Sequence, residues 1–270
     1  NRDLHSVPTR RSSDRANGQI YFMPLRVENK FLPVLGDIPA AVLAQARLMV
    51  LSYPHNPTTA TATTEFFAEA VAFCQTHNLV LAHDFPYADH CFDGPPAPSV
   101  LQVDPNKTCS IEFFSFSKAY NMGGFRIAYA IGNPELILAL RQVKATIDFN
   151  QYQGILKGAI AALDGPQGCV QTTVATFKTR RDAMVNALNH HGWTVTSPDA
   201  TMYLWAKLPE MFPDSIDFCG RLVEATGIAL APGRGFGKAG EGYVRFALVQ
   251  PPQTLEKAAQ QIIEFINSQC

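Results

Sequence analysis

Apolar runs that end at polar residues recur along the first half of the chain. Four of them, rich in β-branched, aliphatic and aromatic residues, predict strands over 48–53, 79–83, 111–116 and 126–131. Their almost continuous apolarity predicts burial on both faces of a parallel or mixed sheet. Between the first two runs, apolar residues share one face of a helix that we predict over 63–78, with Thr63 or Thr64 as its cap. This strand–helix–strand order predicts an α/β fold.

The second half of the chain mixes helical periodicity with shorter apolar runs. The pattern predicts helices over 134–146, 171–191, 216–226 and 254–268. It predicts strands over 194–196, 202–208, 228–231 and 243–249. These elements indicate a second, smaller α+β layer. We therefore expect a larger part over residues 19–177 and a smaller C-terminal part over residues 178–270.

The charge and cysteine content argue against several classes of partner. Lysines and arginines (22) nearly balance aspartates and glutamates (23), so the net charge of −1 gives no electrostatic case for nucleic acid or a membrane surface. The six cysteines are scattered, with no Cys-x-x-Cys pair and no zinc-type spacing, so we expect free thiols and no metal site. No apolar run approaches the roughly 18–20 residues of a membrane span. We expect a cytoplasmic protein.

The most informative stretch lies at the end of the third predicted strand. It reads Ser115-Phe-Ser117-Lys118 and continues to Arg126, eight residues after the lysine. A lysine amine can form a Schiff base with an aldehyde. Neighbouring hydroxyls and a guanidinium can hold a phosphate, the guanidinium through two oxygens at once. These residue types indicate a site for a covalently bound, phosphorylated aldehyde. The alternative is a strand end followed by a polar loop.

Polar residues also follow the first two predicted strands. Asn56 follows the first, within Asn-Pro-Thr, and Asp84 and Tyr87 follow the second as Asp-x-x-Tyr, which begins 28 residues after Asn56. Ligands of open α/β sheets collect at the carboxyl ends of strands, so these side chains are candidates for the same site. Each has a structural alternative: Asn-Pro starts turns, Asp caps helices and turns, and Tyr87 fits a core position. His83 faces opposite to Asp84 and is expected to pack within the sheet.

In this order, the motifs closely resemble those of the fold-type I, pyridoxal-phosphate-dependent aminotransferases of class I and II. The resemblance covers roughly residues 19–270, and Asn121-Met-Gly-Gly-Phe-Arg with Tyr203-Leu-Trp is most similar to the group with LL-diaminopimelate, aspartate and alanine aminotransferases. It implies a large domain with a mixed, mostly parallel sheet that is incomplete at its N-terminus, and a smaller α+β C-terminal domain. It further implies transfer of an amino group between an amino acid and a 2-oxoacid, pyridoxal 5'-phosphate as cofactor, and a homodimer.

The resemblance also implies roles for single residues. The catalytic set is Lys118, which would carry the cofactor and move a proton, Asp84, which would keep the pyridine nitrogen protonated, and Tyr87. The cofactor-binding set is Asn56, Asp84, Tyr87, Ser115, Ser117, Lys118 and Arg126. Arg245 resembles the arginine that binds the substrate carboxylate, and Asn56 is the second substrate-binding candidate. The alternative for Arg245 is an exposed strand arginine. The glycine-rich run 232–239 fails the Walker phosphate-loop pattern.

The first eighteen residues do not fit this pattern. They are polar and aperiodic, and residues 5–14 resemble the translation of a sequencing-adapter oligonucleotide. We expect residues 1–18 to be non-native or disordered, and the alternative is a basic arm for an acidic partner. The chain starts without methionine and the chains of the family are longer, so we expect an N-terminally truncated chain that lacks part of the phosphate site.

Two other functional hypotheses stay open at this point. Motifs that are shared across fold-type I do not exclude another chemistry, such as that of a β-lyase or an acyl transferase. A truncated chain could also be an inactive fragment that binds the cofactor poorly. A requirement for 2-oxoacid separates transamination from the first alternative, and cofactor binding separates it from the second.

Overall fold

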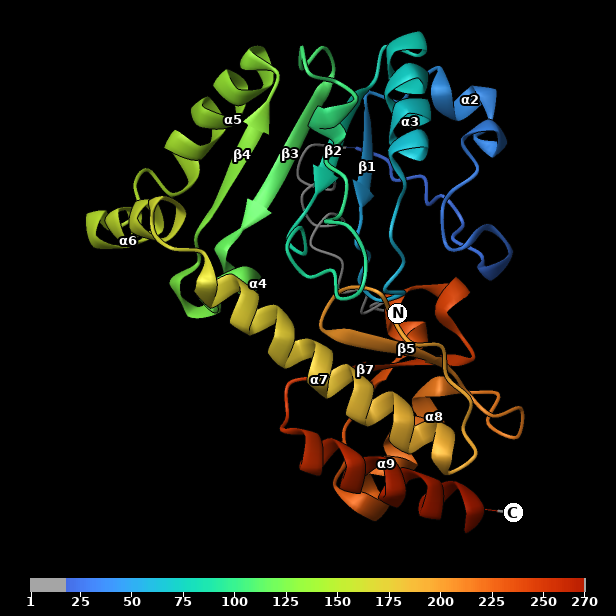
Figure 1. Cartoon of the computed structure of the whole chain (residues 1–270). Helices are drawn as coiled ribbons and strands as arrows, with labels where there is room; N and C mark the ends of the chain where they lie inside the picture. Colours follow the sequence, from blue (N-terminus) through green and yellow to red (C-terminus); the bar gives the residue numbers. More distant parts are fainter. Residues whose placement is uncertain (1–17, 270) are drawn as a thin grey trace.

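The computed structural model describes residues 18–269 and arranges them around two sheets (Figure 1). The larger sheet holds β1 Leu48–Ser52, β2 Val80–Asp84, β3 Ser110–Ser115 and β4 Ala128–Gly132. The smaller sheet holds β5 Tyr203–Lys207, β6 Ala231–Pro232 and β7 Tyr243–Ala247. The α-helices are α2 Ala40–Leu43, α3 Thr64–Thr76, α4 Phe116–Ala119, α5 Pro134–Ile147, α6 Gln153–Asp164, α7 Gly168–His190, α8 Ser215–Thr226 and α9 Pro252–Asn267. The adapter-like stretch 5–14 lies outside the described residues.

The larger sheet has the order β1-β2-β3-β4. Its first three strands are parallel, and β4 runs antiparallel to β3. The predicted α/β fold with a mixed, mostly parallel sheet is therefore confirmed. Ser52 pairs with Asp84, and Asp84 pairs with Phe113, so the three parallel strands end at nearly the same level. The polar residues that follow them share one edge of the sheet.

Helix α3 covers one face of β1 and β2, as the apolar periodicity predicts. Thr63 caps it, because its side-chain oxygen accepts a hydrogen bond from the backbone N–H of Phe66 at 3.2 Å. The helix buries its apolar stripe in a core that includes Met49 and Leu51 of β1 and Leu81 of β2. The buried residues of the stripe are Phe66, Phe67, Ala70, Val71 and Cys74.

The expectation that every strand is buried on both faces is wrong for β1 and β4. Strand β2 meets it, since Leu81, Ala82 and His83 are all buried. In β1, burial alternates, and Leu48 and Val50 are exposed. Both β1 and β4 have one neighbouring strand in the described part of the chain. An edge strand that is covered on one face only shows alternating burial. An apolar run in the sequence does not reveal that the second face lacks cover.

The structure adds one helix and corrects two further predictions. Helix α6 was not predicted, and its two glycines, at 154 and 158, weaken its helical signal. Residues 194–196 form no strand, because the backbone of Val195 bonds the side chain of Asn189 instead of a neighbouring strand. Of the predicted strand 228–231 only Ala231 pairs, and the pairing continues to Pro232, since the N–H of Ile228 donates to the Thr226 hydroxyl just after α8.

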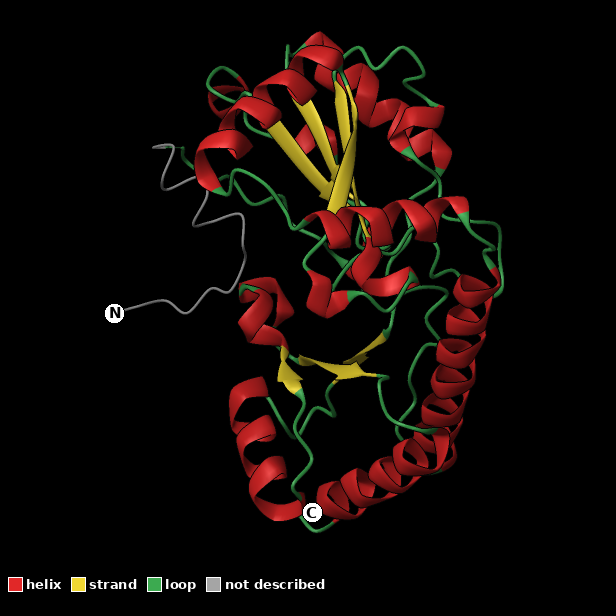
Figure 2. Cartoon of the chain, turned by 90° about the vertical axis from the view of Figure 1, so that its left-hand side faces the viewer, coloured by secondary structure: helices red, strands yellow, loops and turns green. Residues whose placement is uncertain are grey.

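The smaller sheet has the order β5-β7-β6, is antiparallel throughout, and carries its own core. Leu204 of β5 and Val244 and Phe246 of β7 face a layer made by α7, α8 and α9. Figure 2 shows the two sheets one above the other, with α7 running as one long helix from the larger layer down the side of the smaller one. In residues 18–269, no helix has the length and apolarity needed to cross a membrane.

One fully buried histidine, His90, lies where the two layers meet. Its backbone N–H donates to the carbonyl of Tyr87 at 3.0 Å, and its carbonyl accepts from the N–H of Thr201 at 2.9 Å. Its ring packs 5.4 Å from the ring of Phe177 of α7, between centroids, and neither ring nitrogen has a hydrogen-bond partner among the described residues. Burial, with the positive charge of Lys118 adding to it, lowers the pKa of His90 to about 4.

We predict that His90 makes the protein less stable as the pH falls. Between its ordinary pKa of 6.5 and its folded pKa of about 4, the unfolded chain binds the proton more readily, so stability is lost as the pH falls through this window. The full effect is at most about 3 kcal/mol. Urea unfolding at a series of pH values should show a shallower slope for His90→Leu. His55, whose pKa burial also lowers to about 4, should account for a further part of the slope. The exposed His190 is the control, and equal slopes in His90→Leu and His190→Gln would contradict this prediction.

Candidate functional site

The candidate site lies at the carboxyl edge of β1, β2 and β3, facing the smaller sheet. Asn56 lies in the turn after β1, Asp84 ends β2, and Ser115 ends β3. Two hydrogen bonds join this edge to the smaller sheet, one from Arg245 to Asn56 and one from Tyr87 to Tyr203. Residues from both halves of the chain therefore meet at one place, as the order of the motifs predicts.

Arg245 and Asn56 are in direct contact although 189 positions separate them in the sequence. The Arg245 Nη1 donates to the Asn56 Oδ1 at 2.7 Å. The guanidinium carbon lies 4.1 Å from the ring centroid of Tyr203 and 4.7 Å from that of Phe236. Its Nε has no hydrogen-bond partner among the described residues. The guanidinium is thus held by two rings and an amide while part of its donor capacity stays unused.

Asp84 ends its strand without capping a helix or a turn. No backbone N–H of the described residues donates to its carboxylate, which accepts a hydrogen bond from the Ser52 side chain. The side chain reaches solvent, but protein atoms surround enough of it that burial raises its pKa. The charge of His83 and the hydrogen bond from Ser52 act in the opposite direction. A nearby cation would favour its charged form.

Tyr87 and Lys118 lie close together at the centre of the site. The Tyr87 hydroxyl is buried and donates to the Tyr203 hydroxyl at 3.3 Å. Burial, followed by the neighbouring Tyr203, raises the pKa of Tyr87 well above its ordinary value. The Lys118 Nζ lies 5.8 Å from the centroid of the Tyr87 ring. This half-buried amine forms no hydrogen bond or ion pair with the described residues, so it is available to react.

The chain after β3 forms a helical turn instead of a polar loop. The Ser115 Oγ accepts from the Ser117 backbone N–H at 3.1 Å and caps α4, which carries Lys118. The Met122 N–H donates to the Phe116 carbonyl at 3.2 Å and folds the chain back beside α4. Arg126 follows with a left-handed backbone (φ 51°), and its Nη1 donates to the Gly123 carbonyl at 3.1 Å. No hydrogen bond joins Arg126 to Ser115 or Ser117.

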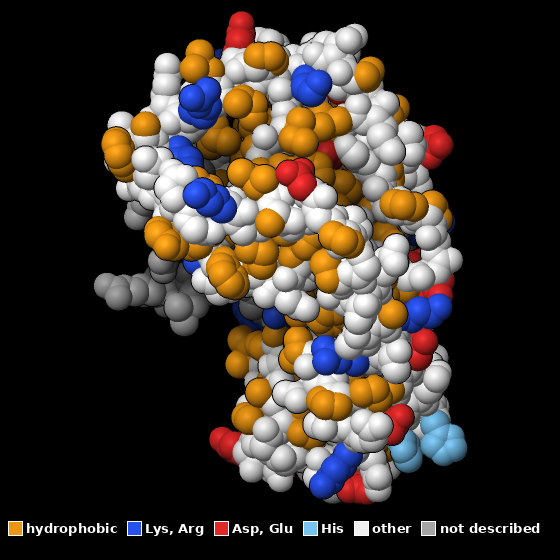
Figure 3. Space-filling view, turned by 60° about the vertical axis from the view of Figure 1, so that its left-hand side comes forward, with side chains coloured by type: hydrophobic (Ala, Val, Ile, Leu, Met, Phe, Trp, Pro, Cys, Tyr) orange, Lys and Arg blue, Asp and Glu red, His pale blue; other side chains and the backbone are white. Residues whose placement is uncertain are grey.

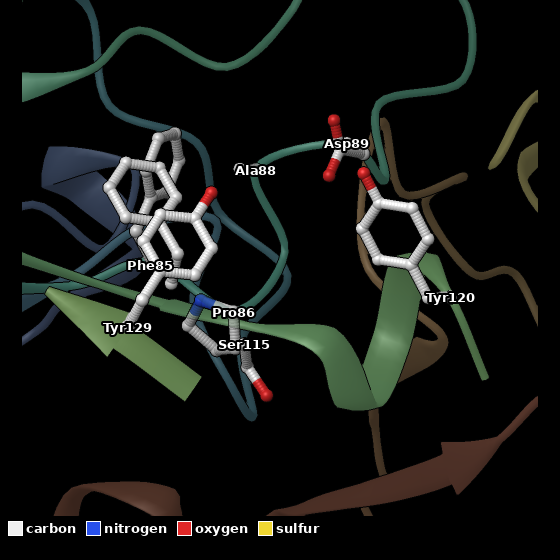
Figure 4. A pocket seen from close by; sticks show the side chains of 8 residues that line it. Phe85, Pro86, Ala88, Asp89, Ser115, Tyr120 and Tyr129 are labelled. Atoms are coloured by element: carbon white, nitrogen blue, oxygen red, sulfur yellow. The ribbon is translucent and has the colours of Figure 1, made fainter. Parts of the chain in front are cut away.

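A small cavity of about 120 Å³ borders the site (Figure 4). In this view the rings of Phe85 and Tyr129 stand on one side, Asp89 and Tyr120 stand on the other, and Pro86 and Ser115 lie between them. Among the predicted site residues, only Ser115 lines it. The complete lining is Phe85, Pro86, Ala88, Asp89, Phe114, Ser115, Tyr120 and Tyr129. Neither Lys118 nor Arg245 lines the cavity, so it is not the space between these two side chains.

The free polar groups at this edge match a phosphorylated aldehyde. Within residues 18–269, the Lys118 amine and the Ser117 hydroxyl have no hydrogen-bond partner, and Arg126 donates only through Nη1. The amine for the aldehyde and the Ser117 hydroxyl are thus unpaired, and the Arg126 guanidinium keeps unused donors for a phosphate. The Asp84 carboxylate completes a donor and acceptor set that fits pyridoxal phosphate.

Several residues of the site were not assigned roles from the sequence. Tyr203 and Phe236 hold Arg245, and a fully buried pair, His83 and Glu112, lies behind Asp84. A signal for the pair was present, because Glu112 is the one charged residue in the apolar run 111–116 and a histidine lies in the preceding strand. The packing of His83 within the sheet was predicted, but its partner was not.

Comparison with known proteins gives the family of this chain. The family Aminotransferase class I and II matches residues 10–262. The LL-diaminopimelate aminotransferase of Dehalococcoides mccartyi strain 195 is 43% identical over 94% of the chain, and the chain spans 65% of the length of that relative. LL-diaminopimelate aminotransferase 2 of Trichormus variabilis is also 43% identical over 94% of the chain, and the chain spans 65% of its length.

Solved structures agree as well. Substrate-bound BacF from Bacillus subtilis superposes with a TM-score of 0.92 at 35% identity, covering 97% of this chain and 67% of that one. A probable N-succinyldiaminopimelate aminotransferase from Thermus thermophilus superposes with a TM-score of 0.88 at 40% identity, and the match covers 97% of this chain and 70% of that one. Because the family match covers most of its residues, this chain belongs to the class I and II aminotransferases.

Proposed function

We propose that this chain is the greater part of a pyridoxal-phosphate-dependent aminotransferase that moves an amino group between an amino acid and a 2-oxoacid. The observation that carries the proposal is the meeting of Arg245 with Asn56 at the strand edge that bears Asp84 and Lys118. The names of the relatives make LL-diaminopimelate the first amino acid to test. A β-lyase or an acyl transferase would not need the 2-oxoacid, so the requirement for it decides between these activities.

The phosphate of the cofactor would be held by three side chains. These are Ser115 and Ser117 around the start of α4 and Arg126 after the turn. When bound, pyridoxal phosphate supplies an aldehyde that a lysine can hold and a ring that accepts electrons. The guanidinium of Arg126 suits two phosphate oxygens, since only one of its nitrogens is engaged by Gly123.

Lys118 and Asp84 would divide the proton chemistry. The Lys118 amine, unpaired and over the Tyr87 ring, would bind the cofactor and then carry a proton to and from the substrate Cα. The Asp84 carboxylate would accept a hydrogen bond from a protonated ring nitrogen, and that cation would offset the raised pKa of Asp84. Asn56 and Tyr87 would donate to the phenolate oxygen, for which Tyr87 must release Tyr203.

Arg245 would bind the α-carboxylate of the substrate. Its guanidinium already lies between Tyr203 and Phe236, and Asn56 engages only Nη1. Such a fork matches both oxygens of a carboxylate, which aligns the Cα–H bond of the substrate. Asn56 would thus contact both the cofactor and the arginine.

We also propose a homodimer through an apolar surface on α5, α6 and the segment between them. This surface includes Leu138, Val143, Ile147, Phe149, Tyr152 and Ile160, all exposed. Figure 3 turns forward the side of the molecule that carries α5 and α6 in Figure 1, and hydrophobic side chains gather over its upper half. An exposed apolar patch of this extent is typical of an interface. Because the family resemblance implies a homodimer, a second copy of the chain is the occupant that we test.

Two other expectations stand as proposals. The division of the chain at residues 177/178 would separate a cofactor-binding domain from a smaller one. A reducing, cytoplasmic location agrees with the free thiols of Cys74, Cys91, Cys109, Cys169 and Cys219.

We predict that pyridoxal phosphate attaches to Lys118. Borohydride reduction fixes the cofactor on the lysine that holds it, and peptide mapping of the 270-residue chain should find the label on Lys118. Lys118→Ala should lose this label and Lys107→Ala should keep it. A label on Lys107 or Lys144 in the wild-type chain would show that the assignment is wrong.

We predict that Asp84→Asn lowers turnover by at least about a hundredfold, because a neutral amide cannot stabilise a protonated ring nitrogen. Since burial raises the pKa of Asp84, its charge costs stability at neutral pH, and the free energy of unfolding should stay equal or rise in the variant. Steady-state kinetics and urea unfolding measure the two effects. Asp89→Asn, in the loop that follows β2, is the control. Near-normal turnover with lost stability in Asp84→Asn would favour a purely structural carboxylate.

We predict that Ile147→Asp with Phe149→Asp separates the dimer into monomers, because both side chains are exposed within the apolar surface (76% and 79%). Light scattering after size exclusion gives the mass. Ile216→Asp on α8, which is also exposed but lies outside this surface, should leave the dimer intact. A wild-type chain that is monomeric at tens of micromolar would reject the interface.

A further inference from the structure

A buried chain of polar groups joins the ends of the three parallel strands behind the site. His83 of β2 is fully buried, and its Nδ1 lies 2.7 Å from the Glu112 Oε1 of β3. Its Nε2 lies 2.9 Å from the carbonyl oxygen of Tyr53 and 3.2 Å from the Tyr53 nitrogen, just after β1. One imidazole thus bonds to both neighbouring strands.

The carboxylate of Glu112 is fully satisfied although no part of it reaches solvent. Besides His83, it accepts from the Val100 backbone N–H at 2.9 Å and from the Ser99 hydroxyl at 2.5 Å. A buried charge with three donors is held in one orientation, because every departure leaves it unpaired. While Nδ1 faces this carboxylate, Nε2 lies within hydrogen-bond distance of both backbone polar atoms of Tyr53.

Each residue of this chain of contacts is a short distance along the backbone from a site residue. Tyr53 is three residues before Asn56, His83 is next to Asp84, and Glu112 is three residues before Ser115. Because neighbouring residues on a strand face opposite sides, His83 points away from the site while Asp84 points toward it. The ring of Phe85, on the other side of Asp84, stacks on His83 at 4.7 Å between centroids.

We propose that His83 and Glu112 are positioning residues that fix the relative placement of Asn56, Asp84 and Ser115. The proposal rests on the proposed function for the identity of these three residues as site residues. If one strand shifted along its neighbour, the site residue at its end would move with it. Such a shift would break the hydrogen bonds of His83 and Glu112 inside the sheet, where no water can replace them.

A second buried carboxylate, in the loop before β3, gives a matched control. Asp104 is 3% exposed and accepts from the Ser110 hydroxyl at 2.7 Å and from the Thr108 backbone N–H at 2.8 Å. It braces the amino end of β3, at the opposite edge from the site. Asp104→Asn therefore perturbs a buried polar network without touching the strand ends that carry the site.

The first measurement is amide hydrogen exchange of the cofactor-free chain. His83→Phe should speed exchange in peptides covering 53–58 by about tenfold or more, because the Tyr53 contact is lost. His83→Asn keeps a donor for Glu112 but cannot reach Tyr53, so it should speed exchange in 53–58 alone, and it answers the same question if His83→Phe does not fold. Glu112→Gln keeps an acceptor for His83, so its amide exchange rates should stay near those of the wild-type chain. Equal exchange in 53–58 for the His83 variants and Asp104→Asn would overturn the proposal.

The second measurement is the dissociation constant of pyridoxal phosphate, read from its absorbance. His83→Phe should weaken binding by about ten- to a hundredfold, because the strand ends that carry the binding residues lose the contact that fixes their spacing, and Asp104→Asn should not. Equal weakening by both variants would show a merely structural role. If the wild-type chain binds no cofactor, the proposed function fails, while the exchange experiment still decides whether His83 and Glu112 hold the strand ends.

Discussion

The parallel alignment of β1, β2 and β3 is the constraint on which the site depends. Parallel strands in register end together, so residues that follow three separate apolar runs arrive at one edge without any contact in sequence. The antiparallel β5 and β7 then bring Tyr203 and Arg245 to the same edge. Arg245 bonds to Asn56 and Tyr87 bonds to Tyr203, so the geometry of the site depends on where the smaller sheet lies.

Much of this arrangement could be predicted from the sequence. The strands that bear the site were found because their apolar runs end at Asp84 and at Ser115-Phe-Ser117-Lys118, where periodicity and chemistry change together. Helix α3 was found because its cap and its apolar stripe agree. The α/β class followed from the order of these elements alone.

The rest could not be predicted, because it depends on contacts between distant residues. No local pattern shows that Val195 would bond to the Asn189 side chain, or that one face of β1 would lack cover. The sandwich of Arg245 between Tyr203 and Phe236 joins three separate segments. The partner of His83 needed the register of β2 against β3, which places His83 opposite Glu112.

The rings around Arg245 have a consequence for the entropy of substrate recognition. A free arginine side chain carries about 2 kcal/mol of rotamer entropy, which a carboxylate must normally overcome when it immobilises the chain. Here Tyr203, Phe236 and the Asn56 amide restrict those rotamers during folding, before any ligand arrives. The guanidinium therefore meets a carboxylate as a rigid, preformed surface, and discrimination among substrates falls to the groups that surround their side chains.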